Sequence, residues 1–306
     1  MLKYLEHTDS TNTQLTDFCN QQLAAGNAIE NLTTIYTFSQ SAGRGQQGNK
    51  WESEPGQNLL FSTAFLLPQL PAQQQFRITE LVALAVWETV SDILHRDAPQ
   101  ISDSLKIKWP NDLYAADRKL AGMLIENCLA GRHILYSVAG IGLNVNQTAF
   151  TQNVPNPVSL SLLTGQRYDL HELMQQILTA FARLLPLIEQ GGFQTLHSMY
   201  MQHLYRRQGW FEWEERECST APSDPLFAHE SNSSQKTDGS NSSQNANGSG
   251  GAQKTNGSGG VGNIIQPDSK RFEAQIEGVD EQGRLLLTDR SGGRRCYHFK
   301  QIRYVI

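Results

Sequence analysis

The chain has 306 residues, of which 39% are hydrophobic and 18% charged, and its net charge is −5. This length allows about two domains with buried cores, and the negative charge argues against a protein that holds nucleic acid through bulk positive charge. No apolar stretch approaches the ~20 residues of a membrane span, and the N-terminus lacks the apolar segment of a signal peptide. The four cysteines are scattered without a C-x-x-C pair, which favours a reduced, cytoplasmic protein.

Helices and strands alternate in the first 200 residues. Ser10 and Thr11, followed by NTQLTDFCNQQL, predict a capped helix. Stretches rich in β-branched and apolar residues predict strands at 33–38, 59–66, 105–109, 123–128 and 134–143. Apolar residues at helical spacing predict helices at 76–94, 170–187 and 193–205. We therefore expect one domain of mixed helices and strands at 1–203.

The remaining residues predict a second, smaller domain at 204–306. The segment 270–306 alternates with period two, has turn residues at 281–283 and 291–293, and joins a strand at 210–216 in a small β-barrel. Residues 231–260 contain no aromatic residue and no Leu, Ile, Val or Met. Because such a segment cannot offset its ordering entropy by burying apolar area, we predict a disordered low-complexity insertion at about 229–263.

The sequence GRGQQG at 43–48 matches G-x-G-x-x-G, but its context excludes three familiar phosphate-binding loops. A dinucleotide-binding loop leads into a helix, whereas a P-G pair follows here at 55–56. A kinase needs Asn five residues after the Asp of H-R-D, and the H-R-D at 95–97 has Ser102 there, so we interpret it as a solvated helix end. A Walker A loop needs Lys and then Ser or Thr after the last glycine, and this chain has N-K at 49–50.

The composition of this glycine loop (residues 43–50) nevertheless suits an anion site. Three glycines let the backbone approach a ligand closely and direct several N–H groups at it. Arg44 adds a permanent cation with a fork of donors. Trp51 follows the loop and is suited to stack on a flat ligand or to cover it. The alternative, a plain surface turn, leaves Trp51 unexplained.

A second polar group lies in KWPNDLYAADRKLAGMLIEN at 108–127. Lys108 is expected at the end of one strand and Lys119 on the next strand, after a turn at 115–118. Two lysines on adjacent strands can converge on one small anion, and Asn111 and Asp112 between them can cap or coordinate. Taken alone, the pattern also fits a hairpin with solvated lysines.

Four segments in this order resemble the biotin–protein ligases: STN at 10–12, SAGRGQQGNKW at 41–51, the segment at 108–127, and GIGLNVN at 140–146. The resemblance covers residues 8–200 and extends to the C-terminal barrel. It implies an α+β fold of the class II synthetase-like, biotin–lipoate ligase type with a mixed sheet, plus a small SH3-like β-barrel. It also implies that biotin and ATP form biotinyl-5′-AMP, from which a lysine of a biotin carboxyl carrier domain takes the biotin.

The same resemblance implies roles for individual residues. Arg44, Lys108 and Lys119 are expected to be catalytic, with Lys119 at the reacting carboxyl oxygens and Lys108 on the phosphate side. The residues expected to bind biotin are Ser10, Thr11, Asn12, Gln40, Arg44, Gly45, Gln46, Lys119 and Gly122. Those expected to bind the nucleotide are Gly43, Gln47, Trp51, Asn111, Asp112 and Asn144, and Asp112 is also the expected Mg²⁺ ligand. Family loops often carry more arginines where this chain has Gln46, Gln47 and Asn49.

Two other functions stay open at this point. A lipoate or octanoyl ligase has the same catalytic fold, although the K-W-P-N-D sequence and the barrel argue against it. A non-catalytic biotin-binding regulator is the second alternative, and the presence of Arg44, Lys108 and Lys119 argues against that one. The predicted catalytic domain begins almost at Met1, as in family members without a DNA-binding domain, so no operator DNA is expected as a partner. No membrane partner is expected either, and homodimerisation is left open.

Overall fold

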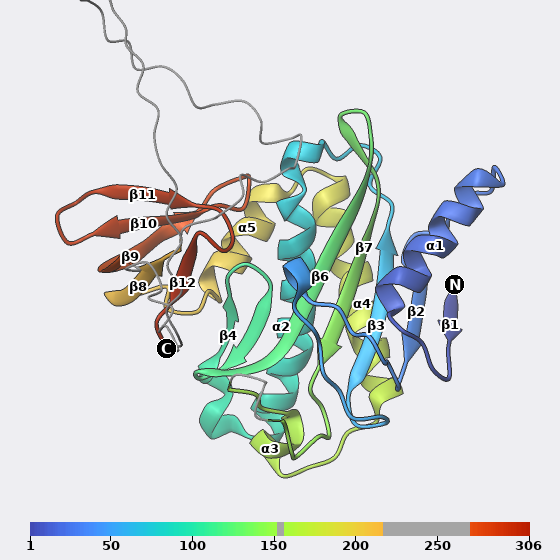
Figure 1. Cartoon of the computed structure of the whole chain (residues 1–306), viewed down its shortest axis with the longest axis horizontal. Coiled ribbons are helices and arrows are strands. Elements are labelled where there is room, and N and C mark those ends of the chain that lie inside the picture. The colour runs from blue at the N-terminus through green and yellow to red at the C-terminus, as the bar shows by residue number, and fades with distance from the viewer. Residues whose placement is uncertain (152–155, 217–269) are drawn as a thin grey trace, which may run out of the picture.

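The computed structural model describes residues 1–151, 156–216 and 270–306 (Figure 1). The low-complexity insertion predicted at about 229–263 therefore lies outside the described residues. The described part contains two separate sheets, one of seven strands and one of five. No helix in these three ranges is both long enough and apolar enough to cross a membrane.

The larger sheet has the strand order β1-β2-β3-β7-β6-β5-β4. β1 and β2 pair in parallel and every other neighbouring pair is antiparallel, which confirms the predicted mixed sheet. Three details differ from the prediction: a three-residue edge strand, β1, precedes the first predicted helix, residues 112–115 form an additional strand, β5, and residues 118–130 form one continuous strand across Gly122. The strands are β1 Leu2–Tyr4, β2 Thr34–Thr37, β3 Leu59–Phe65, β4 Leu105–Lys108, β5 Asp112–Ala115, β6 Arg118–Ala130 and β7 His133–Leu143.

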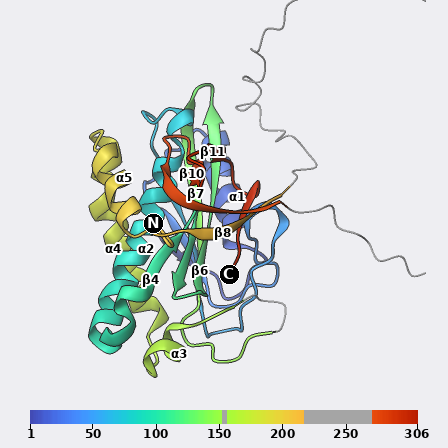
Figure 2. The ribbon, with the colours of Figure 1, turned by 90° about the vertical axis from the view of Figure 1, so that its left-hand side faces the viewer.

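Helices cover both faces of this sheet unequally. The helices are α1 Thr11–Ala24, α2 Phe76–Asp97, α3 Leu160–Thr164, α4 Leu170–Glu189 and α5 Phe193–Gln202, with 3₁₀ turns at Gln46–Gly48, Ala72–Gln74 and Pro99–Ser104. Figure 2 shows α2, α4 and α5 stacked on one side of the sheet, where they bury the main apolar core. α1 packs against β2, β3 and β7 on the other side, over a smaller core that includes Leu15, Ile35 and Val138.

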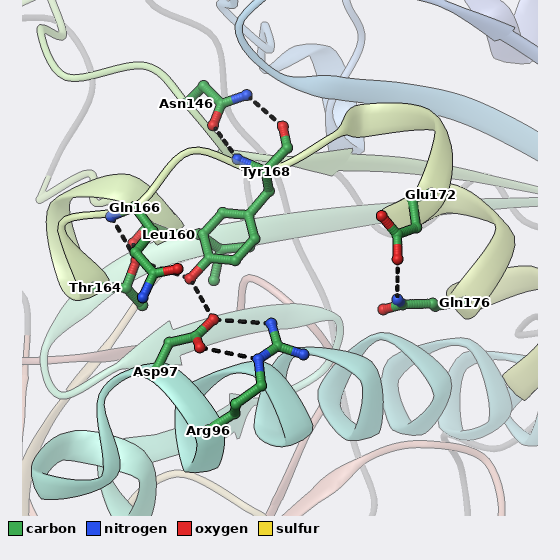
Figure 3. Close-up of polar contacts among 9 residues, drawn as sticks. All are labelled: Arg96, Asp97, Asn146, Leu160, Thr164, Gln166, Tyr168, Glu172 and Gln176. Carbon is green, nitrogen blue, oxygen red and sulfur yellow. Dashed lines mark hydrogen bonds and ion pairs between the residues drawn. The ribbon is translucent and has the colours of Figure 1, made fainter.

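The H-R-D sequence forms the last turn of α2, as predicted. Arg96 is exposed, but the Asp97 side chain is only 9% exposed, so the prediction of a solvated end is wrong for Asp97. Its carboxylate pairs with Arg96 at 2.8 Å and accepts a hydrogen bond from the Tyr168 hydroxyl at 2.9 Å (Figure 3). Asn146 holds the backbone of Tyr168 through two further hydrogen bonds. The motif therefore fastens the end of α2 to the segments after β7.

The smaller sheet is antiparallel throughout, in the order β11-β10-β9-β8-β12, and confirms a small C-terminal β domain. Gly283 (φ 81°) and Gly292 (φ 85°) occupy left-handed positions in its two predicted turns, where residues other than glycine are strained. The strands are β8 Phe211–Glu215, β9 Arg271–Val279, β10 Leu285–Asp289, β11 Arg294–Tyr297 and β12 Ile302–Tyr304.

The two sheets meet at the end of β4. Trp109 Nε1 donates to the Gly283 carbonyl oxygen at 2.9 Å, and its ring lies edge-on to Phe299 at 6.0 Å. Arg206 Nη1 donates to the Val305 carbonyl oxygen at 2.8 Å. Lys108 also contacts this domain, since its Nζ lies 5.1 Å from the centre of the Tyr304 ring. Asn111 and Asp112, the last two residues of K-W-P-N-D, instead line the cavity described below.

Candidate active site

A cavity of about 120 Å³ lies on the α1 side of the seven-stranded sheet. Its walls come from the start of α1, the glycine loop, and strands β5, β6 and β7, while Phe299 reaches it from the C-terminal domain. The structure therefore brings together the four segments that the sequence singled out. The predicted residues that line this cavity are Ser10, Thr11, Asn12, Gln40, Arg44, Gly45, Gln46, Trp51, Asn111, Asp112, Lys119 and Gly122.

The start of α1 forms one end of the cavity. Ser10 is the N-cap residue, with extended backbone and no capping bond from its hydroxyl. Ser62 Oγ lies 2.8 Å from Thr11 Oγ1 and donates to Asn12 Oδ1 at 2.6 Å, so β3 orients the first turn of the helix. The Thr11 N–H donates to Gln40 Oε1 at 3.0 Å. Because first-turn N–H groups have no partner inside a helix, this end of the cavity favours hydrogen-bond acceptors on a ligand.

The glycine loop folds back on itself. The Gly45 N–H donates to the Asn49 carbonyl oxygen at 2.7 Å, and the Trp51 N–H donates to the Gly43 carbonyl oxygen at 2.9 Å. A Cβ atom on Gly43 would lie 2.4 Å from the Trp51 carbonyl oxygen, so this close return requires glycine. Arg44 Nη2 meets Glu126 Oε2 of β6 at 2.7 Å, with both side chains about two-fifths exposed.

Trp51 lies across two glycines that face each other on β6 and β7. Gly122 and Gly142 are cross-strand partners, and a Cβ atom would lie 2.9 Å from the indole at the first and 2.4 Å at the second. The sheet thus leaves room for a flat ring at this point. The indole N–H of Trp51 and Oε1 of Gln46 are buried without a hydrogen-bond partner among the described residues. Each such group costs about 1–3 kcal/mol, so a ligand with matching polar atoms would be favoured here.

Lys119 and Asp112 form an ion pair on the wall of the cavity. Lys119 Nζ lies 2.7 Å from Asp112 Oδ1 and 5.7 Å from the centre of the Trp51 ring, with both charged side chains about one-quarter exposed. Asn111 donates through Nδ2 to the Met123 carbonyl oxygen and accepts the Met123 N–H at 3.0 Å, which fixes β5 against β6. Of the three cationic residues that line the cavity in the described part of the chain, Arg44, Lys50 and Lys119, the first and the last are therefore each paired with a carboxylate of the protein.

Comparisons with known proteins agree with this geometry. The model of the biotin/lipoate A/B protein ligase family matches residues 4–144. That range contains every residue of the cavity except Phe299. Residues 4–144 are therefore similar to the biotin and lipoate protein ligases.

Relatives in this family share moderate identity with the chain. The bifunctional ligase/repressor BirA of Escherichia coli is 32% identical over 60% of this chain and 53% of its own length. The biotin–[acetyl-CoA-carboxylase] ligase of Paracoccus denitrificans is 28% identical over 66% of this chain and 80% of its own length. The chain thus spans about half the length of the BirA relatives that it matches.

Solved structures of the family share the fold. The biotin protein ligase of Aquifex aeolicus in complex with biotin and ATP has a TM-score of 0.64 at 20% identity, covering 99% of this chain and 98% of that one. The enzyme of Leishmania major in complex with biotinyl-5-AMP has a TM-score of 0.55 at 14% identity, covering 97% and 98%. The whole described chain, including the C-terminal β domain, therefore has the fold of a biotin protein ligase.

Of the residues predicted for the site, Gly43, Asn144 and Lys108 do not line this cavity. Gly43 lines a neighbouring cavity on the outer side of the glycine loop, and the side chain of Gln47 lies outside the described atoms. Asn144 is buried and donates through Nδ2 to the Val158 carbonyl oxygen at 3.0 Å, which secures the segment after β7.

Lys108 extends toward the C-terminal domain instead of the cavity. Its Nζ donates to the Tyr114 hydroxyl at 3.2 Å and lies 5.1 Å from the centre of the Tyr304 ring. The pKa of Lys108 is lowered to about 8, mainly by burial; the Asp112 charge opposes this shift, and the Lys119 and Arg206 charges add to it. Lys108 does not line the cavity, although Asp112, the partner of Lys119, is its cross-strand neighbour and the Lys119 charge is close enough to lower its pKa.

Several residues in or beside the cavity were not predicted. Glu126 could have been predicted from strand periodicity. It lies two residues after Leu124 and four after Gly122 on one strand, so it shares a face with both. Gly140 and Gly142 were noted only as part of the segment GIGLNVN, yet a Cβ atom on Gly140 would lie 2.1 Å from Asn12 Oδ1. Phe299 had no signal, since nothing local shows that a barrel loop reaches this cavity.

The described residues contain no group of three or more His, Cys, Asp or Glu side chains arranged to hold a metal ion. Asp112 is the carboxylate on the cavity wall. Mg²⁺ commonly uses one or two protein carboxylates together with substrate phosphates and water. A single carboxylate therefore fits a Mg²⁺ ion that arrives with a nucleotide.

Proposed function

We propose that this protein activates biotin with ATP to give biotinyl-5′-AMP and then transfers biotin to a lysine of a biotin carboxyl carrier domain. One observation carries the proposal: Arg44 of the glycine loop and Lys119 of β6 line the same cavity as the start of α1. This places two cations beside an end suited to a polar neutral ligand, within the fold of biotin protein ligases.

In the first reaction, a carboxylate oxygen of biotin attacks the α-phosphorus of ATP, and the bond to pyrophosphate breaks. Both reactants are negative, so cations must neutralise the charge that gathers between them. Lys119 is assigned to the reacting carboxyl oxygens and Arg44 to the carboxylate and α-phosphate. Asp112, released from Lys119, is assigned to Mg²⁺, which would neutralise phosphate charge.

In the second reaction, the neutral amine of the acceptor lysine attacks the acyl carbon of the adenylate. The bond from that carbon to the phosphate oxygen breaks, AMP leaves, and the amine loses a proton to solvent. Lys119 and Arg44 stabilise the departing negative charge. The carboxylase named in the Paracoccus denitrificans relative supports a carrier domain as the acceptor.

The cavity must enlarge before it holds both substrates. Its volume of about 120 Å³ is below the ~300–1,000 Å³ usual for small-molecule sites. A cavity of about 830 Å³ lies on the outer side of the glycine loop and shares Arg44, Gly45 and Trp51 with it. We infer that the loop and Trp51 move when the ligands enter, with the start of α1 and Gln40 taking the biotin ring and Trp51 taking the adenine.

The remaining assignments are also proposals. Gly122 lies beneath Trp51 and suits a flat ligand group. The nucleotide is assigned to Gly43, Gln47, Asn111 and Asn144. Asn144 acts indirectly, through its hydrogen bond to the Val158 carbonyl oxygen. Lys108 is assigned to the phosphates through the long-range effect of its charge. Its cross-strand partner is Asp112, the residue assigned to the Mg²⁺ ion that the phosphates bind. A cytoplasmic location and the absence of operator binding stay predictions, and homodimerisation stays open.

The experiment tests which carboxylic acid the protein activates and whether a carrier domain accepts it. The protein is incubated with ATP, Mg²⁺ and biotin, lipoate or octanoate, and adenylate and pyrophosphate are measured. We expect biotinyl-5′-AMP, and labelled biotin on a purified carrier domain when one is added. Adenylate only with lipoate or octanoate would establish the rival ligase that the family name also covers. Biotin binding without pyrophosphate release would establish a regulator.

A further inference from the structure

Glu126 connects three parts of the site that are distant in the sequence. Its Oε2 lies 2.7 Å from Arg44 Nη2 of the glycine loop and accepts from Asn12 Nδ2 at 2.9 Å. Glu126 itself belongs to the middle of β6. One carboxylate oxygen therefore joins the loop, the first turn of α1 and the sheet.

The hydrogen bonds continue from this oxygen into the predicted biotin end. Asn12 also donates to the Leu124 carbonyl oxygen at 3.3 Å, while its Oδ1 accepts from Ser62 at 2.6 Å. Ser62 contacts Thr11. With both ends of its amide occupied, Asn12 has a defined orientation, and Glu126 passes that orientation to Arg44.

The link from Arg44 to Glu126 ties the loop to the sheet. The other hydrogen bonds described for residues 43–50 run within the loop or to Trp51 directly after it. Gly43, Gly45 and Gly48 make the unattached ensemble of this loop broad. Arg44 has five N–H donors, so the bond from Nη2 leaves donors for a ligand oxygen.

We propose that Glu126 is a positioning residue that anchors Arg44, and with it the glycine loop, in the wall of the cavity so that the guanidinium meets the anionic group of the substrate. The assignment of that anion to biotin rests on the function proposed above. Because the ion pair is partly exposed, its loss changes the position of the loop and leaves the stability of the fold nearly unchanged.

The first measurement is the affinity for biotin without ATP. Glu126→Ala removes the acceptor of two hydrogen bonds, one of them charge-assisted, and should weaken biotin binding about tenfold. Glu126→Gln retains shape and one acceptor and should weaken it about threefold. Glu52→Gln is the matched control, because Glu52 lines the outer cavity but pairs with Thr151 at 2.5 Å.

A double-mutant cycle separates positioning from general damage. In an Arg44→Ala background, adding Glu126→Ala should weaken biotin binding by less than about twofold, since the cation that Glu126 positions is already absent and Asn12 keeps its hydrogen bonds to Leu124 and Ser62. Equal losses in both backgrounds, or unchanged binding in Glu126→Ala, would overturn the proposal. A large fall in melting temperature for Glu126→Ala that Glu126→Gln does not restore would show a structural role instead.

Limited proteolysis tests the anchor without any ligand. Trypsin cleaves after Arg44 and Lys50, and Glu126→Ala should speed this cleavage about two- to fivefold while Glu52→Gln leaves it unchanged. If the wild-type protein proves not to bind biotin, the proposed function fails, and this readout still decides whether Glu126 anchors the loop. Equal cleavage rates in wild type and Glu126→Ala would reject the anchor.

Discussion

The two faces of the seven-stranded sheet differ in composition and in purpose. On the face under α2 and α4, Phe61 and Phe65 of β3 pack against Phe181 of α4, and all three are fully buried. On the α1 face, the same strand presents Leu60 to the cavity and Ser62 to Asn12. One face holds the fold together, and the other supplies the proposed chemistry.

Strand periodicity explains how one strand serves both purposes. Successive side chains point to opposite faces, so alternate positions evolve under different demands. On β6 and β7, Met123 and Ile141 belong to the apolar core, whereas Gly122 and Gly142 leave space for Trp51. Substitutions one position apart should therefore separate stability from activity.

The largest expected effect is on the helix-covered face. Phe181→Ala removes a buried ring from the aromatic group and should lower the free energy of unfolding by about 3–5 kcal/mol. Urea denaturation measures this loss. Phe181→Leu, which keeps most of the volume, should cost less than about 1.5 kcal/mol and leave the affinity for biotin unchanged. A weakened affinity in Phe181→Leu would contradict the division between the faces.

On the α1 face, Lys119→Ala should slow adenylate formation by about 10²–10³, because it removes a cation assigned to the developing charge. The fold should survive, since the Asp112 carboxylate that loses its partner is partly exposed to water. Single-turnover pyrophosphate release and the melting temperature measure the two quantities, with Lys106→Ala on β4 as the control. Unchanged turnover would remove Lys119 from the site.

The smallest expected effect concerns Lys108, which lies between the two domains. Its pKa of about 8 is below the ordinary 10.5, so the unfolded chain binds more protons between these pH values. Stability should therefore rise with pH across that window, while any contribution of the Lys108 charge to adenylate formation is lost above pH of about 8. Lys108→Met should remove both dependences. An alkaline fall in rate that persists in Lys108→Met would assign it to another group.

Much of the fold followed from local patterns. Apolar periodicity predicted α2, α4 and α5, and period two predicted the C-terminal strands, because both signals arise from burying one face of an element. The three-residue β1 was missed, since so short a strand has no period to detect. The continuity of β6 across Gly122 was also missed, because that glycine is retained for the space it leaves to Trp51.

By itself, the sequence determined the element types and most of the cavity residues, since glycine spacing, charge and ordered motifs are local properties of the chain. Tertiary structure alone decided which charges meet. Lys108 and Lys119 were both expected at one small anion, yet Lys108 packs against Tyr304 and Lys119 pairs with Asp112. Glu126 and Phe299 joined the site for the same reason: strand pairing and domain packing bring residues together across distances along the chain that no local pattern records.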